Sequence, residues 1–125
     1  MLLVDDEDLV RALVREILAL EGYRILEASC ASEALAVEER FTGVIDLLLT
    51  DFIMPGASGA ELAASMAARP PQTRVLYMSG YPGETIMTRG ALGEGVGILN
   101  KPFTAEGLVE RVHTVLIAGE QTIRT

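Results

Sequence analysis

Residues 44–55 read VIDLLLTDFIMP, a nearly continuous apolar run that ends at Asp51 and enters a turn at Pro55. A strand with one solvated face alternates apolar and polar residues, whereas this run places apolar residues at neighbouring positions. Such runs are typical of strands that are covered on both faces in parallel sheets. The stretch therefore predicts a buried strand at the centre of a parallel sheet, with Asp51 at its carboxyl end.

Strand-like and helix-like segments alternate along the rest of the chain, and we count five of each. The other four strands are predicted at residues 2–4, 23–28, 75–78 and 96–100. This alternation is typical of βαβ units built around one parallel sheet. The sequence therefore predicts a single α/β domain, without repeats or linkers.

Apolar residues at helical spacing mark the helices that separate these strands. The stripes comprise Val10, Leu13, Val14, Ile17 and Leu18; Ala31, Ala34 and Leu35; Leu62, Ala63 and Met66; and Ala105, Leu108, Val109, Val112, Val115 and Leu116. A weaker helix is expected at residues 84–92. Gly22 is the predicted stop of the first helix, Ser58 with Glu61 a capping box of the third, and Thr104 the N-cap of the last.

Composition limits the classes of function. The 125 residues carry a formal charge of -8, which argues against nonspecific nucleic-acid binding because that needs clustered Lys and Arg. Cys30 is the only cysteine, so the chain cannot form an intrachain disulfide or a cysteine zinc cluster. No basic leader segment or membrane-length apolar run is visible, so we expect a soluble cytoplasmic domain. Because Met1 begins almost inside the first strand, the domain is a candidate excerpt from a longer chain.

Five polar residues follow four of the predicted strands: Asp5, Asp6, Asp51, Ser79 and Lys101. The carboxyl ends of parallel strands meet at one edge of the sheet, where α/β proteins bind ligands. Like charges about 4 Å apart repel by roughly 4 kcal/mol at an effective dielectric constant near 20, so the carboxylates would exclude a phosphate group unless a cation neutralised them. Mg²⁺ prefers oxygen ligands and commonly uses one or two carboxylates with phosphate oxygens. The pattern thus predicts magnesium and phosphate chemistry, with Asp51 as nucleophile.

Four motifs together resemble the receiver domain of two-component signalling: VDDE at 4–7, TDFIMPG at 50–56, MSG at 78–80 and KPF at 101–103. Each alone is a weak signal, but their order behind successive predicted strands is specific. The resemblance implies a flavodoxin-like doubly wound sheet of order 2-1-3-4-5, with five helices in three layers. It further implies a receiver domain over residues 1–118 and a C-terminal tail over residues 119–125.

The resemblance also implies a role for each matched residue. Asp51 would accept the phosphoryl group, Asp5, Asp6 and the backbone carbonyl of Ile53 would bind Mg²⁺, Ser79 would be the switch hydroxyl, and Lys101 would contact the phosphate. The Lys101–Pro102 peptide bond is expected to be cis. The donor would be a phosphohistidine of a sensor histidine kinase or of a histidine phosphotransfer domain, and a second receiver is another candidate partner.

Residues 48–51 and 77–81 look most like receivers at the C-terminal end of hybrid histidine kinases. One departure from the pattern is Ile98, which stands where many receivers have a switch Tyr or Phe. Output is therefore expected through the loop at residues 79–83 and the weak helix that follows.

Two alternatives stay open: an interaction module that acts without phosphorylation, and an aspartyl-phosphate phosphohydrolase. The second would need an acid at position 53, where this chain has Ile. A receiver catalyses its own phosphorylation and slow dephosphorylation without being a metabolic enzyme.

Overall fold

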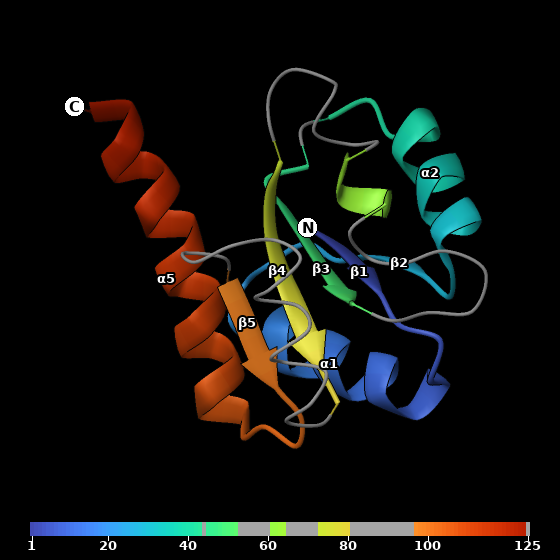
Figure 1. Ribbon diagram of the computed structural model, residues 1–125, viewed down its shortest axis with the longest axis horizontal. Coiled ribbons are helices and arrows are strands. Elements are labelled where there is room, and N and C mark those ends of the chain that lie inside the picture. The colour runs from blue at the N-terminus through green and yellow to red at the C-terminus, as the bar shows by residue number, and fades with distance from the viewer. Residues whose placement is uncertain (44, 53–60, 65–72, 81–96, 125) are drawn as a thin grey trace.

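The computed structural model describes residues 1–43, 45–52, 61–64, 73–80 and 97–124, with side chains described up to residue 117 (Figure 1). The elements in chain order are β1 (Leu2–Val4), α1 (Asp8–Leu20), β2 (Leu26–Ala28), α2 (Ala31–Arg40), β3 (Leu47–Asp51), β4 (Arg74–Ser79), β5 (Gly97–Asn100) and α5 (Ala105–Arg124). Residues 61–64 are also helical. The predicted helix at 84–92 and the capping serine at 58 lie outside the described residues.

The five strands form one parallel sheet in the order β2-β1-β3-β4-β5. Val4 pairs with Thr50, and Asp51 pairs with Met78, so β1, β3 and β4 end at nearly the same level. All five residues of β3 are buried, as expected for the central strand. This is the predicted flavodoxin-like doubly wound sheet.

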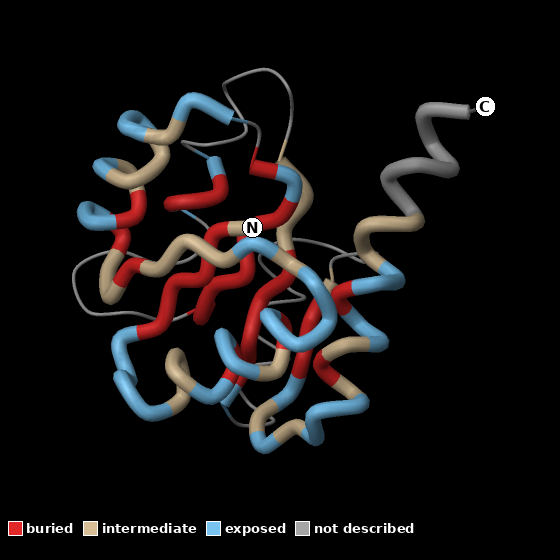
Figure 2. Tube along the Cα trace, turned by 180° about the vertical axis from the view of Figure 1, so that it is seen from behind, coloured by how far each residue is buried: buried red, intermediate tan, exposed pale blue. Residues whose placement is uncertain are grey.

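Side chains alternate between the two faces of the sheet, and each face has its own apolar cluster. Leu2, Val4 and Leu48 pack with α2 and with residues 61–64, whereas Leu3, Leu47 and Leu49 pack with α1 and α5. Figure 1 shows α1 and α5 on one side of the sheet and α2 on the other, and Figure 2 shows the buried residues concentrated in the strands. The molecule therefore has the three predicted layers.

Two expectations about the start of the chain are wrong. Leu13 is 54% exposed, although it was placed on the buried face of the first helix. At about 100° per residue, Leu13 lies a quarter turn from Val14, and α1 buries Val14 and Leu18 instead. The second strand begins at Leu26 rather than at Tyr23, because the amide of Tyr23 donates to the carbonyl of Leu18 and closes the end of α1.

The predicted helix ends at Gly22 and Thr104 are confirmed. Gly22 has a φ of 90°, the left-handed conformation that closes α1 and that glycine adopts without steric cost. The Thr104 hydroxyl accepts a 2.9 Å hydrogen bond from the amide of Gly107 in the first turn of α5. Within the described residues, none of the helices combines the length and apolar composition needed to cross a membrane.

Candidate functional site

The predicted site residues of the described part of the chain lie at the carboxyl edge of the sheet. Asp5 follows β1 directly, Asp51 is the last residue of β3, Ser79 is the last residue of β4, and Lys101 follows β5. Asp5 and Ser79 are fully buried, and Asp51 is only 6% exposed. The parallel strands bring the side chains of Asp5, Asp51 and Lys101 into contact from segments that are far apart in the sequence. Ile53 lies outside the described residues.

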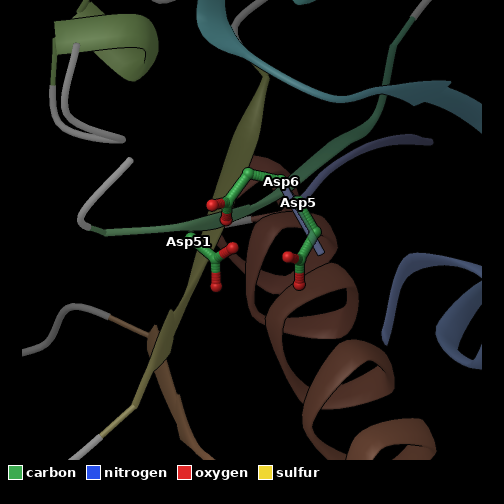
Figure 3. Close-up of side chains that lie close together, drawn as sticks. All are labelled: Asp5, Asp6 and Asp51. Carbon is green, nitrogen blue, oxygen red and sulfur yellow. The ribbon is translucent and has the colours of Figure 1, made fainter. Parts of the chain in front are cut away.

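Three carboxylates converge at this edge. Asp5, Asp6 and Asp51 each place one carboxylate oxygen within 4.8 Å of the others. Figure 3 shows the three side chains lying close together. Asp5 and Asp51 are buried, whereas Asp6 is exposed and closes the group toward solvent. Three negative charges this close repel one another strongly, and hard oxygen ligands of this kind suit Mg²⁺. The donor set therefore fits a divalent cation.

The side chain of Lys101 reaches into the same group of carboxylates. Its Nζ lies 2.7 Å from Asp51 Oδ1, 3.2 Å from Asp5 Oδ2 and 3.9 Å from Glu7 Oε1. Burial by itself lowers the pKa of Lys101, but the hydrogen bond and charge of Asp51, together with Asp5, outweigh burial and raise the pKa. Lys101 is therefore a fixed cation at neutral pH.

The backbone around Lys101 is fixed as well. The Lys101–Pro102 peptide bond is cis, as predicted. The amide of Lys101 donates a 2.7 Å hydrogen bond to the carbonyl of Ser79, which ties the end of β5 to the end of β4. Ser79 thus lies at the same edge of the sheet as the acids.

The two oxygens of Asp51 have different surroundings. Oδ1 accepts from Lys101, whereas Oδ2 is buried and has no hydrogen-bond partner within the described part of the chain. Burial and the neighbouring Asp5 raise the pKa of Asp51 to about 8, against the opposing effect of Lys101. A buried polar atom without a partner is costly, and a cation beside it would remove that cost. This observation supports the fit of the site to a metal ion.

Two contacts of the acid pair were not predicted from the sequence. The amide of Glu7 donates a 2.9 Å hydrogen bond to Asp5 Oδ1, and Arg11 Nη1 donates a 2.7 Å hydrogen bond to the backbone carbonyl of Asp5. The sequence feature that could have indicated the contact of Arg11 is a basic residue near the start of the helix that follows the acid pair. Charge alone does not indicate that such a residue bonds to the backbone.

Comparison with known proteins agrees with this geometry. Residues 1–113 match the family described as response regulator receiver domain, and the chain belongs to that family. The response regulator receiver protein CpdR of Brucella abortus (strain 2308) is 31% identical over 120 residues, which cover 94% of this chain and 96% of that protein. The crystal structure of the receiver domain from the hybrid histidine kinase CckA has a TM-score of 0.75 and 36% identity, covering 92% of this chain and 96% of that chain.

Other relatives are longer than this chain. Sensor kinase CckA of Brucella abortus (strain 2308) is 31% identical over 116 residues, which cover 93% of this chain but only 12% of that protein. The transcriptional activator protein ExaE of Pseudomonas putida is 37% identical over 120 residues, covering 93% of this chain and 54% of that protein. The chain thus spans from about a tenth to about half of the length of these two relatives.

Proposed function

We propose that this receiver domain accepts a phosphoryl group on Asp51 in a reaction that requires Mg²⁺. The observation that carries the proposal is the asymmetry of the Asp51 carboxylate: Oδ1 is held by Lys101 at 2.7 Å, and the buried Oδ2 has no hydrogen-bond partner among the described residues. A carboxylate oxygen that is oriented but unpartnered is suited to attack phosphorus.

The transfer would exchange one bond for another. As the bond from Asp51 Oδ2 to phosphorus forms, the phosphorus–nitrogen bond of a phosphohistidine breaks, and the imidazole keeps the electron pair and takes up a proton. The product is an acyl phosphate on Asp51. The oxygens of the transferred phosphoryl group would compete with Asp5 and Asp51 for the ammonium group of Lys101. Ser79 would donate a hydrogen bond from its hydroxyl to the same phosphoryl group.

Asp5, Asp6, Asp51 and the backbone carbonyl of Ile53 would hold the metal ion. Magnesium, when bound, supplies positive charge that offsets the repulsion between the carboxylates and an incoming phosphate. This assignment rests on the three carboxylates within 4.8 Å of one another and on Asp51 Oδ2, which has no hydrogen-bond partner in the described part of the protein.

The proposed partner is a sensor histidine kinase or a histidine phosphotransfer domain, and the proposed location of the receiver is the cytoplasm. We favour a receiver over residues 1–118 that belongs to a hybrid histidine kinase, since the receiver of CckA is among its structural relatives. The charge of -8 is consistent with an output that this domain exerts through protein contacts, including those with a second receiver, rather than through nucleic acid or membrane lipid. The genomic reading frame would show which domains flank the receiver.

Mass spectrometry after incubation with a small acyl phosphate tests the phosphoacceptor. We expect one added phosphoryl group with Mg²⁺ and none with the metal chelated. Asp51→Asn should abolish labelling. The matched control is Asp46→Asn, which removes an exposed carboxylate just before β3 at the opposite edge of the sheet and should label like wild type. Labelling of Asp51→Asn at the wild-type level would contradict the assignment, and the absence of labelling in wild type would favour a phosphorylation-independent interaction module.

A further inference from the structure

The side chain of Arg11 links the turn that carries the acid pair to its surroundings. Its Nη1 donates to the backbone carbonyl of Asp5 at 2.7 Å, and its Nη2 lies 2.7 Å from Asp8 Oδ1. Its Nε faces Glu27 Oε1 on β2 at 3.6 Å. Only 18% of the side chain is exposed. The planar guanidinium is therefore held on three sides, which restricts where its Nη1 can point.

The carbonyl that Arg11 holds belongs to the peptide group that joins Asp5 to Asp6. Because a peptide group is planar, fixing this carbonyl also fixes the direction of the Asp6 amide and of the chain that enters Asp6. The amide of Asp5 donates to the carbonyl of Ala28, and Asp5 Oδ1 accepts from the amide of Glu7. Together with the bond from Arg11, these hydrogen bonds fix the backbone between Asp5 and Asp6.

The charge of Arg11 is matched locally. Asp8 and Glu27 both lie within salt-bridge distance of its guanidinium, and Glu27 also pairs with Arg15, so the positive and negative charges of this cluster balance. Its electrostatic effect on the more distant carboxylates is accordingly small. The direct contact between Arg11 and the site is a hydrogen bond to the backbone, which acts on geometry.

We propose that Arg11 is a positioning residue for the metal site: by holding the Asp5–Asp6 peptide group, it sets the direction in which Asp6 presents its carboxylate beside Asp5 and Asp51. This inference rests on the proposed function, in which Asp6 binds Mg²⁺. Residues that orient metal ligands typically change metal affinity by about 10- to 100-fold when they are removed.

Arg15 offers a matched control because it shares one partner with Arg11 but not the other. It lies one turn later on α1, and its Nη1 contacts Glu27 Oε2 at 3.3 Å. Among the described residues Arg15 makes a polar contact with Glu27 alone, so Arg15→Ala removes the same charge from the same helix face while leaving the bond from Arg11 to the carbonyl of Asp5 in place.

Calorimetric titration with Mg²⁺ at constant ionic strength should separate the two arginines. We expect Arg11→Ala to raise the Kd for Mg²⁺ about 10-fold and Arg15→Ala to change it less than about twofold. Arg11→Lys keeps the charge but lacks the planar fork, and should raise the Kd about threefold; it also serves if Arg11→Ala does not fold. Equal affinity in wild type and both Arg11 variants, or an equal loss in Arg15→Ala, would overturn the positioning role.

Amide ¹⁵N relaxation of the metal-free protein distinguishes failure of this inference from failure of the proposed function. The Asp6 amide belongs to the peptide group that Arg11 holds, so its order parameter should fall from about 0.85 toward 0.6 in Arg11→Ala and stay unchanged in Arg15→Ala. If wild type does not bind Mg²⁺ but the Asp6 order parameter falls as expected, the proposed function fails and the positioning contact stands. If the order parameter does not change, the positioning role is refuted whatever the metal affinity.

Discussion

Asp51→Asn should stabilise the metal-free protein at neutral and mildly alkaline pH. Asparagine preserves the size and shape of the aspartate side chain but removes its charge. In wild type Asp51 is only 6% exposed, and one of its carboxylate oxygens lies within 4.8 Å of oxygens of Asp5 and Asp6. The substitution therefore removes repulsion and a buried charge, at the cost of the contact with Lys101.

Once Asp51 is ionised in the folded protein, above about pH 8, the size of the effect follows from three terms. At an effective dielectric constant near 20 and the 4.8 Å limit, Asp51 is repelled by about 3.5 kcal/mol from each of Asp5 and Asp6. Lys101 at 2.7 Å attracts it by about 6 kcal/mol on the same scale. These terms nearly cancel, so the cost of burying the charge, up to several kcal/mol per ion, decides the sign. We expect a gain of about 1–3 kcal/mol in the free energy of unfolding.

The raised pKa of Asp51 makes this gain depend on pH. Its pKa is about 8 in the folded protein and 3.8 ordinarily. Between these values the folded state binds more protons than the unfolded state, so the stability that Asp51 contributes in its protonated form is lost as pH rises through this window. The difference between Asp51→Asn and wild type should therefore grow from about pH 5 to about pH 8.

Urea denaturation followed by circular dichroism, with a metal chelator present, measures this difference; the chain has no Trp for fluorescence. The control is Asp46→Asn, whose exposed carboxylate should change the stability by less than about 0.5 kcal/mol. Mg²⁺ at about 10 times its Kd should stabilise wild type by about 1.4 kcal/mol and Asp51→Asn by less. If Asp51→Asn were less stable than wild type at about pH 8, attraction to Lys101 would outweigh burial and repulsion, and the reasoning would be refuted.

Four further predictions concern other parts of the protein. Lys101→Ala should slow phosphorylation by at least about 10-fold in mass spectrometry without weakening Mg²⁺ binding in calorimetry, because Lys101 is a cation and not a metal ligand; a raised Kd for Mg²⁺ would contradict this. Thr104→Ala should lower the free energy of unfolding by about 1 kcal/mol in urea, since it removes the 2.9 Å bond that caps α5. Replacing Ile53 with Asn and Tyr81 with Glu should shorten the lifetime of the acyl phosphate, because neither wild-type side chain can orient an attacking water; an unchanged rate of phosphate loss would show that the reasoning fails. A beryllofluoride phosphate mimic should shift the amide resonances of residues 79–92, and changes confined to the first two helices would exclude that output route.

The missing aromatic switch bears on that last prediction. Ile98 lies on β5 opposite Tyr77 and is only 3% exposed. An aliphatic side chain packed in this way has no hydroxyl or ring to exchange between buried and exposed positions. We therefore expect phosphorylation to act through the loop at residues 79–83, most of which lies outside the described residues.

The amino-acid sequence by itself determined the order of the elements, the parallel sheet and the edge at which the site forms. These features follow from local patterns: the apolar run before Asp51 can only be covered on both faces, and parallel strands all end at one edge. Helix ends at Gly22 and Thr104 were also predictable, because each depends on the chemistry of one residue.

Only the tertiary structure decided how the site is assembled in detail. Asp5 and Lys101 are separated by 96 positions, and their 3.2 Å contact depends on how β1 and β5 are placed in the sheet. Asp51 Oδ2 has no hydrogen-bond partner among the residues that the structure describes, and Arg11 bonds to the Asp5 carbonyl. Both features depend on side-chain directions that sequence spacing does not specify. Leu13 illustrates the same limit, since the rotation of α1 against the sheet selects which apolar residues are buried. Periodicity defines a face of a helix only to within about one residue step of 100°, and packing fixes the rest.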